Sequence, residues 1–60
     1  MTLELNTFLK MHNLASTGGQ AKVLIRSGKV LVNGVVEMRN RKKLLAGDVV
    51  VVDGQQYVVE

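Results

Sequence analysis

Four basic side chains crowd into one short stretch of this 60-residue chain. Arg39, Arg41, Lys42 and Lys43 fall within five consecutive positions, with Glu37 as the nearest acid. Guanidinium groups donate paired hydrogen bonds to phosphate oxygens, and lysine ammonium groups act as adaptable point charges. The cluster therefore has the chemistry to hold a polyanion such as a nucleic-acid backbone. A solvated loop that merely keeps the protein soluble explains the same run, and the run alone does not separate the two interpretations.

A second candidate site is the stretch Thr17-Gly18-Gly19-Gln20, just before an apolar-periodic segment. A helix that begins here exposes unpaired backbone N–H groups and a partial positive charge, which favours a phosphate. Two glycines allow an RNA backbone to approach closely, and the Gln20 amide suits a phosphate, a ribose 2′-hydroxyl or a base edge. A flexible turn between two helices explains these four residues without a ligand.

Lys22 and Arg26 add positive charge along the helix expected after the glycines. They are four positions apart and therefore adjacent, which costs roughly 0.2–0.5 kcal/mol in an isolated helix. A bound polyanion would remove that cost, whereas the alternative is the solvent-exposed face of an ordinary amphipathic helix. Lys29, just beyond the expected helix end, either extends this stripe or interacts with the last helical carbonyl groups.

No set of residues suits catalysis or a cofactor. The chain has no cysteine and its single histidine is His12, so neither a disulfide nor a thiolate-based or histidine-based zinc site is expected. Asp48 and Asp53 fit turns and do not form a paired-carboxylate acid–base site. The segment Gly-Gly-Gln-Ala-Lys lacks the spacing of a phosphate-binding P-loop. We therefore expect a protein that is not an enzyme and that needs no cofactor or metal.

Length and composition describe one small domain, spanning residues 1–60. A chain of this length buries only roughly 60% of its unfolded surface, so packing must be efficient. Hydrophobic residues make up 47% and charged residues 22%, which is typical of a folded globule. The longest apolar run is far shorter than the ~20 residues that span a bilayer, and the N-terminus lacks the pattern of a signal peptide. We expect a soluble cytoplasmic monomer with no membrane contact.

The net charge of +3 is distributed unevenly along the chain. Residues 37–43 carry four basic groups and one acid, whereas residues 44–60 carry three acids and no basic group. Such segregation indicates a cationic face rather than a uniformly charged surface.

Hydrophobic periodicity and turn residues predict the elements that position these side chains. Apolar residues at helical spacing predict a first helix over about 5–13. Thr17 or Ser16 suits the N-cap of a second helix over about 19–27, and Gly28 suits the residue that ends it.

Two hairpins are predicted to follow the helices. Asn33-Gly34, between valine-rich strands, is a strong signal for a type I′ turn, because both central residues of that turn need positive φ. Asp53-Gly54 marks a second hairpin over about 49–59, and the basic run lies between the two. The order of helix, helix, hairpin, loop and hairpin predicts an α+β domain.

Several segments match one known family. The most specific is Gly28-Lys29-Val30-x-Val32-Asn33-Gly34, followed by Leu45-x-Gly47-Asp48-Val49. The other segments are Leu5-x-x-Phe8-Leu9, Leu14-Ala15-Ser16 and Ala21-Lys22-x-Leu24-Ile25. Together, over about residues 5–52, they resemble the S4 RNA-binding domain. Gly18-Gly19-Gln20-Ala21-Lys22, together with Arg39-x-Arg41-Lys42-Lys43-Leu44, is similar to the stand-alone single-domain bacterial S4 proteins of the YaaA/YbcJ type.

The resemblance implies an S4-like (αL motif) fold, in which two N-terminal helices pack on a small, bent antiparallel sheet of two hairpins. It also implies a binding surface at the start of the second helix and the adjacent loops, with structured RNA, usually ribosomal RNA, as the ligand. We therefore expect a non-enzymatic module that recognises RNA through phosphate-backbone and shape contacts. The expected RNA-binding residues are Thr17, Gly18, Gly19, Gln20, Lys22, Arg26, Lys29, Arg39, Arg41, Lys42 and Lys43.

The rival hypothesis is a small protein-interaction module that docks on a ribosomal protein or an assembly factor. It would use Val23 and exposed strand residues, and the positive charge would serve solubility. The RNA-binding hypothesis requires that two basic patches far apart in the sequence share one face of the molecule. Coordinates that place Lys22 and Arg26 on the opposite side from Arg41 and Lys43 would contradict it.

Overall fold

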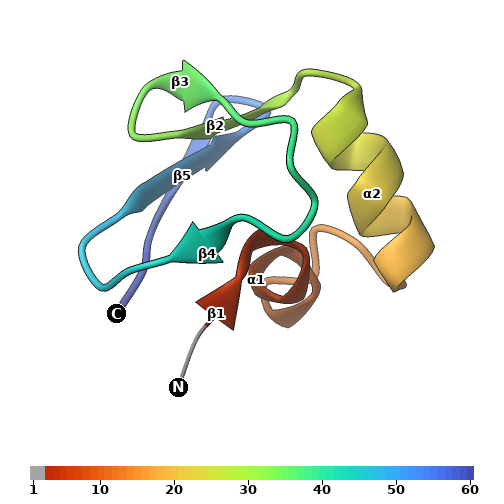
Figure 1. Cartoon of the computed structure of the whole chain (residues 1–60), viewed down its shortest axis with the longest axis horizontal. Coiled ribbons are helices and arrows are strands. Elements are labelled where there is room, and N and C mark those ends of the chain that lie inside the picture. Colours follow the sequence, from red (N-terminus) through yellow and green to blue (C-terminus); the bar gives the residue numbers. More distant parts are fainter. Residues whose placement is uncertain (1–2) are drawn as a thin grey trace.

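Two short helices and six short strands make up the computed structural model, which describes residues 3–60 (Figure 1). The elements are β1 (Leu3–Glu4), α1 (Leu5–Met11), α2 (Gly18–Arg26), β2 (Val30–Val32), β3 (Val35–Val36), β4 (Lys43–Leu44), β5 (Val49–Val52) and β6 (Gln55–Val58). This is the predicted α+β fold, with both helices preceding the two predicted hairpins.

Both helices end where a residue with positive φ turns the chain. After α1, Asn13 has a φ of 58°, and the Leu14 N–H donates to the Leu9 carbonyl at 2.9 Å. After α2, Gly28 has a φ of 82°, and its N–H donates to the Ile25 carbonyl at 3.2 Å. A residue in the left-handed conformation often ends a helix in this way, because it turns the chain so that the next N–H groups can donate to carbonyls of the last helical turn. The first helix is therefore shorter than predicted, whereas Gly28 ends the second as expected.

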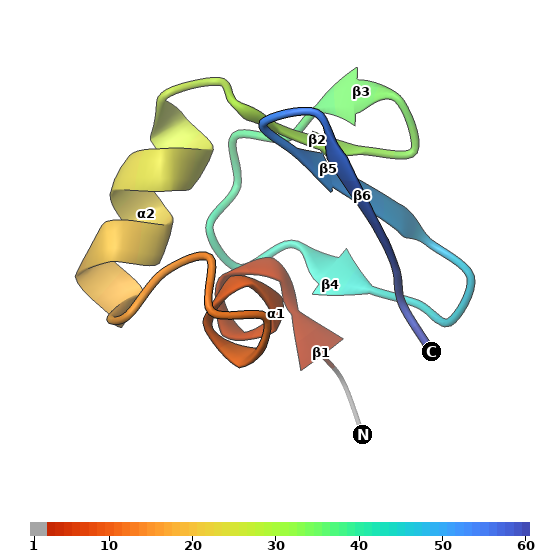
Figure 2. The same ribbon diagram turned by 180° about the vertical axis from the view of Figure 1, so that it is seen from behind.

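The two hairpins form one antiparallel sheet, in the order β3-β2-β5-β6. In both predicted turns the two central residues have positive φ, with values of 53° and 83° at Asn33-Gly34 and 52° and 80° at Asp53-Gly54. The sequence-based prediction of these turns is confirmed. Pairing between β2 and β5 places the second hairpin directly beside the first (Figure 2).

A second, two-stranded sheet was not predicted. β1 and β4 pair antiparallel, with Leu3 opposite Leu44 and Glu4 opposite Lys43. Strands of two residues are too short to show a periodic pattern in the sequence. This pairing ties the end of the basic run to the residues that precede α1.

The hydrophobic core is aliphatic and is shared by both helices and the inner face of the larger sheet. Its largest fully buried side chains come from α1, α2, β2 and β5, and they are Leu5, Leu9, Ile25, Val30 and Val50. Each such side chain contributes roughly 1.5–3 kcal/mol when it is removed from water. Tyr57 is half-buried and packs against this cluster. The core therefore holds the two helices in a defined position relative to the strands.

Candidate functional site

Backbone hydrogen bonds hold the basic segment, residues 39–43, against the start of α1. The Leu5 N–H donates to the Lys42 carbonyl at 2.8 Å, and the Asn6 N–H donates to the Asn40 carbonyl at 3.1 Å. These N–H groups belong to the first turn of α1, where a helix provides no internal acceptor. The basic segment therefore caps α1 with its own carbonyls, and folding determines its position.

A turn inside the basic segment changes the direction of its side chains. The Lys42 N–H donates to the Arg39 carbonyl at 3.3 Å, which closes a tight turn over residues 39–42. Lys43 follows in β4. Successive side chains of a strand point to opposite faces, so Lys43 is exposed and Leu44 is buried. In an extended loop the side chains of Arg39 and Arg41 would point the same way. The turn shows that the basic segment is not such a loop.

Two ion pairs orient the arginines of the basic segment. Arg39 Nε lies 3.0 Å from Glu37 Oε2, and Arg41 Nε lies 3.1 Å from Glu4 Oε2. The Arg39 and Arg41 side chains nevertheless remain 71% and 79% exposed. The partner carboxylates of Glu37 and Glu4 are 13% and 26% exposed, so the pairs lie at the surface with only the arginines open to solvent. Both guanidinium groups are therefore pre-oriented and still accessible.

The contact between Arg39 and Glu37 changes the pKa of both side chains. The hydrogen bond from the Arg39 guanidinium lowers the pKa of the Glu37 carboxyl, and the nearby positive charge of Arg39 acts in the same direction. The carboxylate in turn raises the pKa of Arg39. Both groups are therefore ionised at neutral pH.

Helix α2 presents three different sides. Ala21 and Ile25 are fully buried in the core, and Leu24 lines a surface groove on the next side. Successive residues of a helix are rotated by about 100°. Lys22 and Arg26 therefore project from the flank roughly opposite Leu24, away from the groove.

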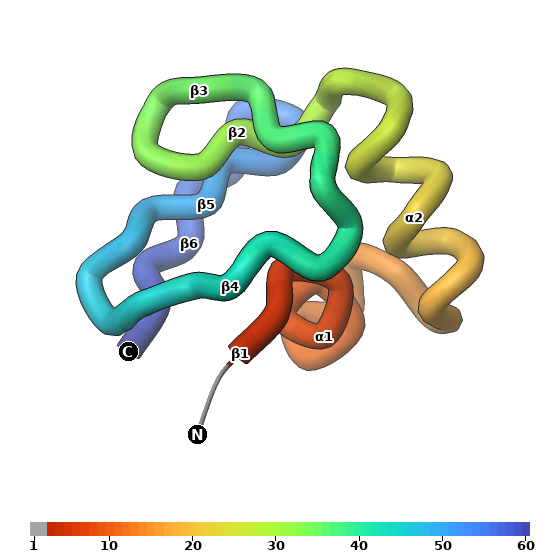
Figure 3. The backbone as a smooth tube through the Cα atoms, viewed as in Figure 1, coloured from red at the N-terminus to blue at the C-terminus, as the bar shows by residue number. Residues whose placement is uncertain are grey.

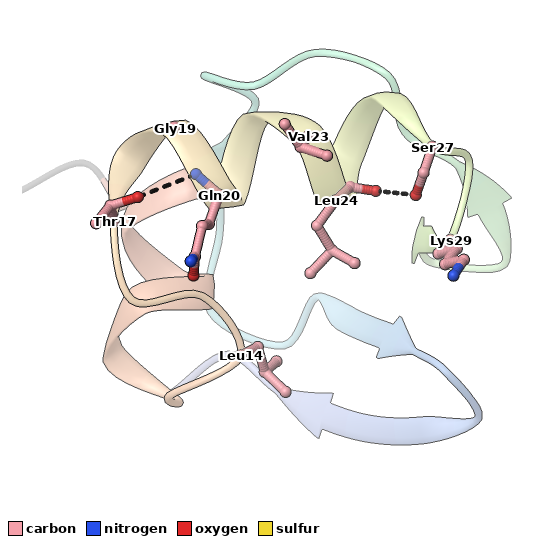
Figure 4. A pocket seen from close by; sticks show the side chains of 8 residues that line it. All are labelled: Leu14, Thr17, Gly19, Gln20, Val23, Leu24, Ser27 and Lys29. Atoms are coloured by element: carbon pink, nitrogen blue, oxygen red, sulfur yellow. Dashed lines mark hydrogen bonds between the residues drawn. The ribbon is translucent and has the colours of Figure 1, made fainter.

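The segment that joins β3 to β4 passes beside α2 on its way to the start of α1 (Figure 3). In the view into the groove, the same segment runs behind α2 (Figure 4). The backbone of the basic segment therefore runs beside α2, on the side of that helix away from the groove (Figures 3 and 4). We use the name cationic face for the basic residues of these two neighbouring elements, which are Lys22, Arg26, Arg39, Arg41, Lys42 and Lys43.

The start of α2 is capped by two reciprocal side-chain contacts. The Gln20 N–H donates to Thr17 Oγ1 at 3.1 Å, and Gln20 Oε1 accepts from the Ser16 N–H at 2.9 Å. This pattern is close to a capping box, and it establishes Thr17 as the N-cap. The N–H groups of Gly18 and Gly19 lie in the first turn of α2, where the helix has no carbonyl to accept their hydrogen bonds. The two capping contacts do not use these N–H groups.

Nothing within residues 3–60 requires glycine at the first two positions of α2. An added Cβ at Gly18 would meet no atom within 4 Å, and at Gly19 it would meet only Thr17 Oγ1, at 3.8 Å. Neither glycine has a positive φ. The absence of side chains at these two positions therefore serves neither internal packing nor backbone conformation.

Four of the predicted site residues lie away from the cationic face, along the groove on the other flank of α2 (Figure 4). The groove has a volume of about 600 Å³, and its lining is Leu14, Thr17, Gly19, Gln20, Val23, Leu24, Ser27 and Lys29. Lys29 does not extend the stripe of Lys22 and Arg26, because Gly28 turns the chain before it. The predicted site is therefore divided into two surfaces, with α2 between them.

Sequence reasoning did not single out Leu14, Leu24 or Ser27 as site residues. Their pattern resembles that of ordinary core or helix-end positions, so periodicity alone could not find them. The available signal was Val23, an apolar residue on the solvent side of α2, which is 70% exposed.

Among residues 3–60, no group of three or more histidine, aspartate or glutamate side chains gathers as a metal site. No helix in this part of the chain is long and apolar enough to cross a membrane.

Comparison with known proteins identifies the family. The model of the S4 domain family matches residues 1–60. This chain belongs to the S4 domain family. The resemblance inferred from its motifs is thereby confirmed, and the observed order of two helices and two hairpins agrees with it.

Curated relatives of this S4 domain are bacterial. The chain is 40% identical over 57 residues to "Putative RNA-binding protein YbcJ" of Escherichia coli (strain K12), covering 95% of this chain and 81% of that protein. It is 38% identical over 52 residues to "Probable ribosome maturation protein RlbA" of Bacillus subtilis (strain 168), covering 87% and 73%, respectively.

Proposed function

We propose that this S4 domain is a non-enzymatic module that binds structured RNA, ribosomal RNA in particular, through its cationic face. The observation that carries the proposal is that the backbone of the basic segment, with four basic residues, passes beside α2, which carries Lys22 and Arg26 on its flank away from the groove (Figures 3 and 4). Relatives named as an RNA-binding protein and as a ribosome maturation protein support the same ligand class.

The geometry suits a phosphate backbone. Lysines and arginines from two elements offer several separate contacts, and the α1 cap holds one of these elements in place. A positioned surface loses less conformational entropy on binding than a mobile loop would. Double-stranded RNA is recognised largely through its shape and its phosphates, because side chains cannot read its narrow major groove.

The start of α2 provides a further phosphate contact in this proposal. The N–H groups of Gly18 and Gly19 point out of the helix end, where the helix dipole favours negative charge. Lys22 lies one turn further along α2, so one RNA strand can reach the helix end and the cationic face together.

Exposed apolar side chains favour a second candidate function, docking on a ribosomal protein or an assembly factor. Val23, Val35 and Val58 are all exposed. Capture of partners from a bacterial lysate, with and without ribonuclease, separates the two functions. Loss of partners after ribonuclease treatment supports RNA binding, whereas partners that persist support direct protein docking.

RNA-binding measurements at increasing salt test the main proposal. Contacts to about four to six phosphates give a slope of log K against log salt of about −3 to −5. The double variant Arg41→Gln and Lys43→Gln should weaken binding with little change in thermal unfolding, because both side chains are exposed and no acid is added beside Glu4. A flat salt response, or equal affinity of the double variant and the natural chain, would contradict the phosphate mechanism.

The proposal includes the oligomeric state and the cellular location of the protein. The domain acts as a monomer in the cytoplasm, with ribosomal proteins as its neighbours on a shared RNA. Sedimentation of the purified chain at micromolar concentration tests the first point.

A further inference from the structure

The groove beside α2 is not part of the cationic face, and its side chains suggest a ligand of its own. It lies on the opposite flank of the helix, and its apolar wall is made by Leu14, Val23 and Leu24 (Figure 4). Val23 is 70% exposed, although a β-branched residue is less favourable in a helix than alanine. An exposed apolar wall in a groove is typical of a surface that becomes covered by a ligand.

The polar groups of the groove are few and are oriented. Gln20 Oε1 accepts hydrogen bonds from both the N–H and the hydroxyl of Ser16, which holds the amide in one orientation. The amide nitrogen has no partner among the described residues and remains a donor beside the apolar wall. Ser27 Oγ donates to the Leu24 carbonyl at 2.6 Å, so its lone pairs remain as acceptors.

The charge of the groove favours an anionic occupant. Lys29 stands at one end, and the lining residues include no aspartate or glutamate. The groove therefore combines an apolar wall, a fixed amide donor and a cation. A nucleotide has the complementary groups, namely the faces of a base, acceptors on the base edge and a phosphate.

We propose that the groove holds one unpaired nucleotide of the bound RNA. The base lies against Val23 and Leu24, its edge accepts a hydrogen bond from the Gln20 amide, and a neighbouring phosphate contacts Lys29. Bases removed from a stack are held by apolar side chains and edge hydrogen bonds in this manner. This inference rests on the proposed function and narrows it, because the preferred RNA then carries a bulge, loop or free end beside a paired stem.

Three RNA probes and two matched variants test the inference. The probes are a fully paired hairpin stem, the same stem with one bulged adenosine, and the same bulge with an abasic ribose. Val23→Thr exchanges a methyl group for a hydroxyl in the groove. Val35→Thr makes the same exchange in β3, outside the groove and at nearly equal exposure, 69% against 70%.

We expect the natural chain to bind the bulged stem about tenfold more tightly than the paired stem, since contact with one base contributes an effect of this size. The abasic bulge should lose this preference. The ratio of bulge to stem affinity should fall toward one in Val23→Thr and stay unchanged in Val35→Thr. Circular dichroism melting of both variants checks that each is folded.

The outcomes separate this inference from the proposed function. Equal binding of all three probes, as expected if the groove serves an acidic peptide instead, would overturn the groove inference and leave RNA binding intact. An unchanged ratio in Val23→Thr, or equal loss in Val35→Thr, would also overturn it. Failure of every probe to bind at low salt would refute both.

Discussion

Lys22 and Lys10 form a charge-matched pair that tests whether location, rather than total charge, governs RNA binding. Lys22 projects from α2 on the cationic face, whereas Lys10 is exposed in the last turn of α1, at the opposite end of that helix from the basic segment. Lys22→Gln and Lys10→Gln each change the net charge of the chain from +3 to +2. Any effect of net charge alone must therefore be the same for both variants.

The size of the expected effect follows from counterion release. One lost phosphate contact reduces the magnitude of the slope of log K against log salt by about 0.7–0.9. At 0.1 M salt this corresponds to a five- to eightfold weaker association for Lys22→Gln, and the difference should disappear as the salt approaches roughly 1 M. Lys10→Gln should keep both the slope and the affinity of the natural chain.

Fluorescence anisotropy with a labelled RNA hairpin, measured over a salt series, gives both quantities for the natural chain and the two variants. Thermal unfolding of each variant shows whether the fold is retained. If the two variants weaken binding equally, net charge explains the association and the assignment of the cationic face is wrong. A slope for Lys22→Gln identical to that of the natural chain would remove Lys22 from the site.

Three further predictions concern the ends of the elements. Gly18→Ala should stabilise the fold by up to about 1 kcal/mol, because there is room for the methyl group, yet it should weaken RNA binding; unchanged affinity in a filter-binding assay would argue against close approach of a phosphate. Thr17→Ala should lower the free energy of unfolding in urea by about 1 kcal/mol through loss of the N-cap, and a change below the error would show that Ser16 and Gln20 suffice. The pKa of Asp48 is lowered by hydrogen bonds from the Leu45 N–H and from Asn33, so this carboxylate stabilises the fold above its ordinary pKa and the contribution is lost as the pH falls through the lowered value; melting of Asp48→Asn between pH 7 and pH 3 should show a flatter acid decline than that of the natural chain.

The local elements could be predicted because their causes are local. Asn33-Gly34 and Asp53-Gly54 specify their turns through the positive φ that these residues tolerate, whatever surrounds them. Gly28 ends α2 for the same reason. The end of α1 was not predicted, because Asn13 tolerates both a helical and a left-handed conformation. In the folded chain it is left-handed, and Leu14 after it packs against the core.

The residue types of the candidate site could be predicted from the sequence. That these residues lie on two different flanks of α2 could not be predicted. The basic segment and the glycines before Lys22 were visible as unusual local composition. Their placement on different sides of α2 depends on which residues of that helix enter the core, and Ala21 and Ile25 decide that only once the sheet is present.

By itself, the sequence determined two helices, two hairpins and a set of basic residues suited to phosphates, because each of these depends on neighbours within a few positions. Only the tertiary structure decided how they combine. The Arg41–Glu4 pair joins residues 37 positions apart, and the carbonyls of the basic segment cap a helix that begins more than 30 residues earlier. Such contacts form because unpaired backbone groups and buried side chains must find partners anywhere in the chain, and no local pattern records which partner they find.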